Sequence, residues 1–356
     1  MKKLKQLFSN YLFNIVLVIA LSALIFYLTV RDNPAEVFDR LKKADRLWLL
    51  VVVAAVISIR LFSGFALKQE CNLTHPEYTF RQGVENAFVG GLFNEITPSA
   101  SGGQFAQVFL FRRQGIPLTE AAGVLWMNFI IYQTTMVVSV FILLLLKFHE
   151  FYSKYSQFFV IVLLGFAVNA AVIVSLWALI RFPKFYTWLS TKGISIAAKL
   201  HIVRDREKAL ASLDSQITRF QNEINILSGH KDMVFQVALT HFLRLMVYYS
   251  IPFFCTKALR IPISWSSLLD MITLSSFVSM VNAFIPLPGA SGGTEASFLL
   301  MFSTVLGPVN VRPVMLLWRF MTYYFDMMLG GAVFLSLKAR SSISAGSLQE
   351  AEKESQ

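Results

Sequence analysis

The sequence predicts an all-α polytopic membrane protein with about six full transmembrane helices and two re-entrant, broken-helix hairpins in an inverted-topology repeat. Three observations lead to this prediction. The chain of 356 residues is 55% hydrophobic and 15% charged, whereas soluble domains carry about 25% charged residues. Several apolar runs are long enough to cross a bilayer, which takes about 20 helical residues. A Pro/Ser/Gly-rich hexapeptide occurs twice, and each copy interrupts an apolar stretch.

The apolar runs predict the full spans in chain order. They lie at about residues 11–30, 46–67, 118–146, 158–180, 232–255 and 312–337. The first run continues to Val30 without a small-residue cleavage site, so we expect an uncleaved anchor and not a signal peptide. Of the 32 Lys and Arg residues, 19 fall on one side of this topology and 10 on the other, which predicts cytoplasmic termini. The loop 31–46 argues against that orientation, because it places five basic residues on the outer side.

The hexapeptide predicts where the hairpins lie. Pro-Ser-Ala-Ser-Gly-Gly at residues 98–103 returns as Pro-Gly-Ala-Ser-Gly-Gly at residues 288–293, and Leu-Trp-x5-Tyr follows each copy. Matching Pro/Gly breaks in two halves indicate a transporter site built from broken helices, although Gly and Pro are common in membrane helices generally. Residues 80–112 are expected to re-enter from the cytoplasmic side, because the second limb is too short to cross. For residues 265–307 the sequence leaves open whether the chain re-enters or crosses fully.

A single transmembrane domain is expected over residues 1–340. Its half-repeats would occupy about 46–146 and 232–338, with hairpins entering from opposite faces. A cytoplasmic amphipathic linker is predicted for residues 181–231, because apolar residues recur there every three or four positions. The Ser-rich tail at 341–356 is expected to be disordered.

The two motifs supply the first group of candidate substrate-binding residues. Each would place the start of a helix near the bilayer midplane, where free N–H groups and the helix dipole favour an anion. The Ser-x-x-Gln spacing in the first motif fits a capping box, and the Ser of the second motif is also a candidate cap. Alternatively, the Gly-Gly pairs only allow the hairpins to pack closely. The candidates are Ser101, Gly102, Gly103, Gln104, Ser291, Gly292, Gly293, Thr294 and Glu295.

Ionisable side chains inside the predicted spans and hairpins supply the second group, because a charge within a membrane is costly and by default indicates function. They are Arg60, Glu95, Arg244, Arg319 and Asp326. Arg60 and Arg244 precede the two hairpins at similar places and suit a phosphate, which arginine binds bidentately. The alternative is a set of interior ion pairs, Arg60 with Glu95 and Arg244 with Glu295 or Asp326. His241, three residues before Arg244, is expected to be a hydrogen-bonded interior residue.

Other classes of function find no support in the sequence. It contains no metalloprotease, serine hydrolase or P-loop motif and no spaced Cys/His cluster, so we expect no enzyme, metal or cofactor. The net charge of +11 follows the membrane topology, so nucleic acid is not expected as a partner. The expected partners are membrane lipids with anionic headgroups. A homo-oligomer and a partner lipid-modifying enzyme both stay open.

The stretches around the two motifs resemble a known family. Residues 94–104, running into 111–117, and residues 285–295 resemble the transmembrane region of lysylphosphatidylglycerol synthases and related flippase-like membrane proteins. The resemblance implies an integral bacterial or archaeal protein that moves a lipid between leaflets. The two-part synthases add a soluble aminoacyl-transferase domain, whereas fewer than 20 residues follow Leu337 here. The resemblance therefore implies neither aminoacylation nor a particular lipid.

Together these features predict a lipid transporter or flippase of the cytoplasmic membrane. Its substrate would be a phosphate-bearing lipid of the phospholipid or polyprenyl-phosphate type, bound between the two Ser-Gly-Gly motifs. Two alternatives remain open: a solute or ion-coupled secondary transporter on the same fold, and a membrane scaffold for a lipid-modifying enzyme.

Overall fold

The computed structural model describes residues 39–97, 100–148, 156–181, 225–226, 228–282, 285 and 287–354. Every regular element within these residues is helical, which confirms the predicted all-α class. The predicted first span at 11–30 and nearly all of the predicted linker at 181–231 lie outside the described residues, as do Pro98 and Ser99.

Four described helical stretches are long and apolar enough to cross a membrane. They are α4 (Arg46–Cys71), α7 (Leu118–Leu146), α12 (Lys231–Ala258) and the stretch Pro288–Arg340. A further helix, α9 (Ser156–Arg181), packs against α7. The start of α4 is fixed by Asp45, whose carboxylate accepts hydrogen bonds from the first backbone N–H groups of the helix.

The first hairpin consists of two short helices. α5 (Phe80–Ile96) has 17 residues and α6 (Gly102–Arg113) has 12, and both fall short of the length needed to cross. α5 begins with a capping box in which Thr79 and Gln82 bond reciprocally. Since α5 packs against both α4 and α15 (Asp326–Glu354), the hairpin lies against two longer helices.

The second hairpin is also built from short limbs. Its first limb is η2 (Trp265–Ser267) and α13 (Leu268–Asn282), and its second limb, after η3 (Pro288–Ala290), is the first part of α14 (Gly293–Arg319). Gly307, at φ 74°, breaks α14 just before Pro308, so neither limb reaches the length of a full crossing. The rings of Phe298 and Trp318, 4.7 Å apart, stack the second limb on the following segment of α14.

The last span is interrupted by a π-helix. The second part of α14 leads into η4 (Phe320–Phe325), which has π geometry and is followed by α15 (Asp326–Glu354). α15 continues to Glu354, although the sequence predicted a disordered tail from residue 341. Ala, Leu, Gln, Glu and Lys in this segment have high intrinsic helix propensity, which favours the extension.

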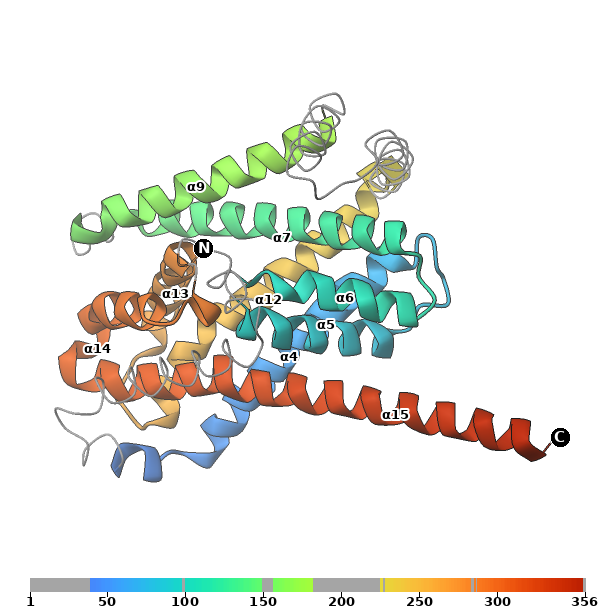
Figure 1. The fold of residues 1–356 in the computed structure, drawn as a ribbon. Helices are drawn as coiled ribbons and strands as arrows, with labels where there is room; N and C mark the ends of the chain where they lie inside the picture. Colours follow the sequence, from blue (N-terminus) through green and yellow to red (C-terminus); the bar gives the residue numbers. More distant parts are fainter. Residues whose placement is uncertain are drawn as a thin grey trace, which may run out of the picture.

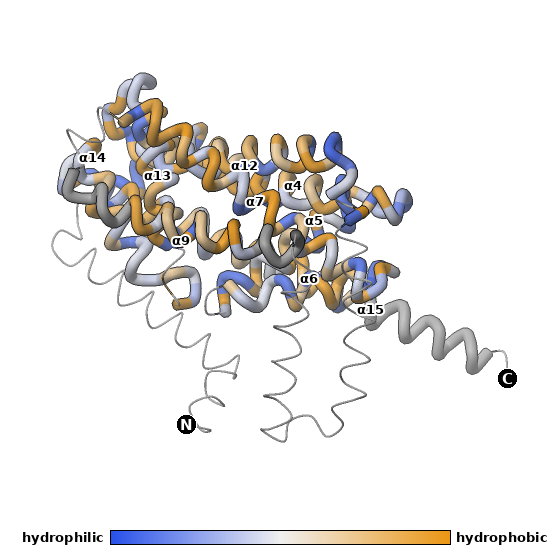
Figure 2. The backbone as a smooth tube through the Cα atoms, turned by 90° about the horizontal axis from the view of Figure 1, so that it is seen from above, coloured by the Kyte–Doolittle hydropathy of each residue, from blue (hydrophilic) through white to orange (hydrophobic). Residues whose placement is uncertain are grey.

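The two hairpins lie at opposite ends of the bundle, as Figures 1 and 2 show, and α4 and α12 pack together between them. The open end of the first hairpin adjoins α15, where Arg340 pairs with Glu85 at 3.1 Å. The open end of the second hairpin adjoins the end of α7, where Lys147 pairs with Asp270 at 2.8 Å. Inside the bundle the tips meet, because η3 packs against α5.

Apolar side chains cover the outside of the bundle as well as its interior, and Figure 2 shows hydrophobic residues along α4, α7, α9 and α12. Large exposed examples include Phe105 on α6, Leu146 on α7 and Phe235 on α12. In water such a surface would favour aggregation or association. In a bilayer it is the surface that faces the lipid chains.

Candidate functional site

A cavity of about 470 Å³ lies within the bundle, where α4, the first hairpin, α7, α12 and the last span meet. Five of the candidates predicted from the sequence line it together, although they come from distant parts of the chain. They are Arg60, Glu95, Gln104, Arg244 and Asp326. The fold therefore brings two cations and two carboxyl groups to one cavity. The other candidates do not line this cavity.

Arg60 and Asp326 form a bidentate ion pair across the cavity wall. The Arg60 Nε donates to Asp326 Oδ1 at 2.9 Å, and a terminal guanidinium nitrogen donates to Oδ2. The pair joins α4 to the first residue of α15. We considered Glu95 as the partner of Arg60, and that pairing is wrong, because η4 places Asp326 against the guanidinium instead.

Arg244 is held by neutral groups. Its Nη1 donates to Ser63 Oγ at 2.8 Å, and its guanidinium carbon lies 4.3 Å from the centre of the Tyr132 ring. No described carboxylate lies within ion-pairing distance of it, so the suggested pairs with Glu295 and Asp326 are wrong. Those two acids are already paired with other arginines. Arg244 thus presents a cation to the cavity that the described carboxylates do not neutralise.

His241 packs behind this arginine. It is fully buried, and its ring meets the Tyr132 ring edge-on at 5.5 Å. Neither ring nitrogen has a hydrogen-bond partner among the described residues. The prediction of a hydrogen-bonded interior histidine is therefore wrong. The His241 ring supports the orientation of Tyr132, which contacts both His241 and Arg244.

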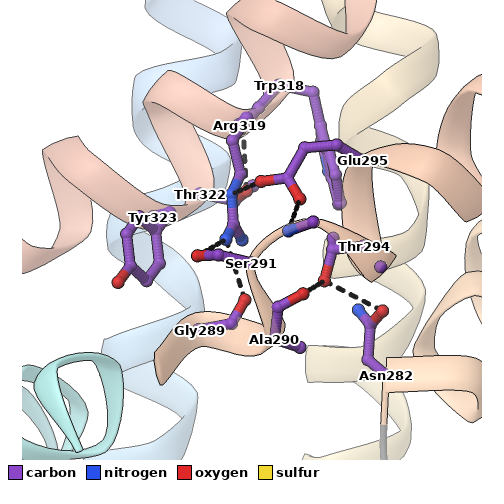
Figure 3. Close-up of polar contacts among 12 residues, drawn as sticks. Asn282, Gly289, Ala290, Ser291, Thr294, Glu295, Trp318, Arg319, Thr322 and Tyr323 are labelled. Atoms are coloured by element: carbon purple, nitrogen blue, oxygen red, sulfur yellow. Dashed lines mark hydrogen bonds and ion pairs between the residues drawn. The ribbon is translucent and has the colours of Figure 1, made fainter. Parts of the chain in front are cut away.

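The second motif is closed by a buried ion pair of the protein itself (Figure 3). The Nε of Arg319 lies 2.7 Å from Glu295 Oε1, and its Nη2 donates to Gly289 O at 2.8 Å and to Ser291 Oγ at 3.1 Å. The other carboxylate oxygen, Glu295 Oε2, accepts from the Gly292 N–H at 2.7 Å. The side chain of Glu295 thus occupies the helix start that we considered for a ligand.

Further contacts fix the same turn. Thr294 Oγ1 donates to Asn282 Oδ1 at 2.9 Å, joining α14 to α13, and Figure 3 shows both side chains below the turn. The Ser291 hydroxyl donates to Pro288 O at 2.9 Å and does not cap α14. Gly293 packs closely enough on Ile285 that an added Cβ would lie 2.0 Å from its side chain. The whole turn is therefore internally bonded and tightly packed.

The first motif is also bonded by protein side chains. The N–H of Gly102 donates to Thr97 Oγ1 at 2.8 Å, and the N–H of Gly103 donates to Asn94 Oδ1 at 3.0 Å. The predicted capping box is wrong, because Ser101 at the N-cap makes no side-chain capping bond. Thr97 and Asn94, on the preceding limb, supply the acceptors. The nearest contacts of this Gly-Gly pair are within one hairpin, where they allow its two limbs to pack closely, whereas the alternative interpretation was close packing of the two hairpins on each other.

Tyr323, which no sequence pattern predicted as a site residue, joins the two hairpins. Its hydroxyl donates to the backbone oxygen of Glu95 at 3.0 Å, and its ring lies 4.1 Å below the Arg319 guanidinium carbon. Gly289 packs against the same ring at φ 56°, and a Cβ there would come within 2.2 Å of it. The repeated Leu-Trp-x5-Tyr pattern directs attention to Tyr132 and to Tyr324, one residue away from the side chain that makes this contact.

Comparison with known proteins identifies the family. Residues 15–330 match the family described as the lysylphosphatidylglycerol synthase TM region. The chain belongs to this family. A UPF0104 membrane protein of Archaeoglobus fulgidus is 23% identical over 328 residues, which cover 89% of this chain and 93% of that relative. No solved structure matches the chain.

Membership in the lysylphosphatidylglycerol synthase TM family confirms the resemblance seen in the motifs and, with the apolar helices, makes the chain a multi-pass membrane protein. The matched residues include both hairpins, the cavity-lining residues and the Arg60–Asp326 pair. The cavity therefore lies within the part of the chain that defines the family.

Replacing Gly91 by alanine is expected to displace Arg60. A Cβ at this position would lie 2.2 Å from the guanidinium carbon, and overpacking of this kind costs about 1–3 kcal/mol. We expect a lower melting temperature of the purified protein. Gly331→Ala is the matched control, because a Cβ there meets nothing within 4 Å. Equal melting temperatures for the two variants would contradict the tight packing of α5 on Arg60.

Proposed function

We propose that this protein is a lipid transporter or flippase that moves a phosphate-bearing lipid across the cytoplasmic membrane. The observation that supports this most is the setting of Arg244, a cavity-lining guanidinium held by Ser63 and Tyr132 and by no described carboxylate. An unpaired cation inside a membrane protein is costly. A phosphate in the cavity would neutralise it and accept hydrogen bonds from its remaining N–H groups.

The other charged residues of the cavity would have different roles. Arg60 is already neutralised by Asp326, so it would mainly hold α4 against the last span and offer a weaker interaction to the phosphate. Glu95, on the wall formed by the first hairpin, would accept hydrogen bonds from hydroxyl or amino groups of a headgroup. The cavity volume of about 470 Å³ is within the range of pockets for small ligands. The acyl or prenyl chains would stay in the bilayer.

The arrangement of the hairpins supports alternating access. We propose that residues 46–146 and 232–338 are inverted repeats, in a chain of six full spans that includes the predicted span at 11–30. The hairpins open at opposite ends of the bundle and their tips meet at η3 and α5, beside the cavity. Movement of one hairpin at a time would expose the cavity to one face and then the other. In this proposal both termini are cytoplasmic and the protein is not an enzyme.

The test is lipid flux in reconstituted liposomes. Fluorescent phosphatidylglycerol, an aminoacylated analogue and a fluorescent polyprenyl phosphate would be assayed for accessibility to a membrane-impermeant reagent. Arg244→Ala is expected to lower the flux about tenfold or more, because a hydrogen bond to a charged group contributes roughly 1.5–3 kcal/mol. Arg81→Ala is the control, because Arg81 is largely exposed and lies outside the cavity.

Two results would contradict the proposal. If Arg244→Ala, folded and present at normal levels, transported as well as the parent chain, Arg244 would have no role in headgroup binding. If the folded parent chain moved none of the three lipids, a solute transporter or a scaffold for a lipid-modifying enzyme would replace the flippase. Competition by a water-soluble substrate would favour the former, and co-purification of an enzyme would favour the latter.

A further inference from the structure

Another buried acid lies near the cavity but outside its wall. Glu70, on α4, is completely buried. Its Oε2 accepts a hydrogen bond from Asn128 Nδ2 at 2.8 Å, and its Oε1 has no hydrogen-bond partner among the described residues. No described Lys, Arg or His lies within ion-pairing distance of it. In this respect Glu70 differs from the buried acids Asp326 and Glu295, which each have an arginine.

Buried apolar residues flank Glu70 along α4. Leu67 and Cys71, on the same part of α4, belong to a buried cluster that also includes residues of α6, α7 and α12. An isolated carboxylate in such a place is strongly disfavoured, and a carboxyl group there avoids the charge by binding a proton. The vacant hydrogen-bonding position on Oε1 is where that proton would reside.

Asn128 connects this acid to the cavity. It donates to Glu70 and also lines the cavity, together with Arg244 and with Ser63 and Leu67 of α4. Leu67 precedes Glu70 by three residues, so the two lie on the same face of α4, one turn apart. A change in the charge or hydration of the cavity can therefore reach Glu70 through a single side chain.

We propose that Glu70 and Asn128 form a proton-binding site that couples the movement of the lipid to a transmembrane proton gradient. One proton would bind the Glu70 carboxylate to give the neutral acid while the cavity faces one side, and would leave after it faces the other. No other bond is made or broken. This inference rests on the proposed lipid transport and names its source of energy.

Other ionisable groups near this end of α4 are less suited to the role. α4 packs against α5, α7, α12 and η4. Two of their acids are paired, Glu120 with His75 at 2.7 Å and Glu85 with Arg81 and Arg340 at 3.1 Å each. Of the others, Glu95 lines the cavity itself, and Asp232 lies in the first turn of α12. Burial raises the pKa of the Tyr78 phenol, which therefore stays neutral at physiological pH. The remaining titratable or charged groups on α4 and on these elements are Arg46, Arg60, Lys68, Cys71, Tyr132, Lys231, His241, Arg244, Tyr248, Tyr249, Cys255, Lys257, Tyr323 and Tyr324.

The experiment imposes a pH gradient of one unit on liposomes whose membrane potential is clamped at zero. The leaflet distribution of the fluorescent lipid that the protein transports is then measured. Coupling of one proton to one lipid would give a leaflet ratio of up to about tenfold. Glu70→Gln is expected to keep exchanging lipid but to hold the ratio at one. Glu77→Gln is the matched control, because Glu77 is exposed at 77% and should leave the gradient response intact.

The outcomes separate this inference from the proposed function. Lipid exchange by the parent chain with a ratio fixed at one, or a Glu70→Gln variant that still responds to the gradient, would overturn the proton site and leave the flippase standing. If the parent chain moves none of the lipids, the proposed function fails, and infrared difference spectra after a pH step test the site alone. A protonated-carboxyl band that appears in the parent chain and in Glu77→Gln but not in Glu70→Gln supports the site. The same band in all three proteins overturns it.

A further variant covers the case in which Glu70→Gln does not fold. Asn128→Leu removes the hydrogen bond to the carboxylate and keeps Glu70. It should shift the pH at which the carboxyl band titrates by about one unit or more, since a hydrogen bond to a charged group is of that size. An unshifted band would overturn the proposal.

Discussion

Glu295→Ala is expected to destabilise the protein by about 3–5 kcal/mol, the usual effect of leaving one member of a buried ion pair without its partner. Arg319, which is 8% exposed, would lose the carboxylate 2.7 Å from its Nε. The N–H of Gly292 would lose its acceptor at the same time. Thermal unfolding of the purified protein in detergent is the measurement, and we expect a large fall in the melting temperature.

Two controls show whether the effect comes from the buried pair. Glu85→Ala removes a carboxylate whose arginine partners are largely exposed, and such pairs contribute about 0–1 kcal/mol. The double variant Glu295→Met/Arg319→Met should recover part of the lost stability, because no unpaired charge remains. If Glu295→Ala were no less stable than Glu85→Ala, the pair would not be what holds the second hairpin on the last span.

Asp326→Ala should have an effect of similar size through a different pair. It leaves the Arg60 guanidinium without its bidentate acceptor. Both side chains are largely buried, Arg60 at 16% and Asp326 at 6% exposure, so about 3 kcal/mol or more of stability should be lost. Since this pair also lines the cavity, lipid flux per folded molecule should fall as well. Thermal unfolding and the liposome assay measure the two effects separately.

A double-mutant cycle tests this interpretation. Arg60→Ala/Asp326→Ala removes both charges and should be more stable than Asp326→Ala alone. Its flux should stay low, because α4 and the last span are no longer joined at the cavity. A double variant whose loss of stability equals the sum of the losses in Arg60→Ala and Asp326→Ala would show that the two side chains do not interact energetically.

The charged candidates could be identified from the sequence because they are ionisable residues in apolar segments. Arg60, Arg244, Arg319 and Asp326 interrupt apolar runs, and an ionisable residue in such a run is unusual whatever the fold. Their partners were not apparent. Arg60 and Asp326 are 266 positions apart, so their pairing depends on how α4 packs against the last span.

The two motifs also show which features the sequence predicts and which depend on the packing. Repetition of Pro, Ser and Gly was enough to locate the breaks between the hairpin limbs. Local rules nevertheless predicted the wrong cap at Ser101, because Thr97 and Asn94 reach the helix start from the other limb. Tyr323 gave no local signal, since its function depends on a backbone oxygen of the other hairpin.

By itself the sequence determined the helical class, the membrane setting, the positions of both hairpins and the family, because these follow from the length of apolar runs, the placing of Pro and Gly, and motifs read along the chain. Tertiary structure alone decided that Arg319 closes the second motif, that Arg244 faces a cavity without a described carboxylate partner, and that Glu70 is buried beside Asn128. Run length and residue type are local properties. Partners of buried charges depend on which helix faces meet, and packing of the whole bundle sets those.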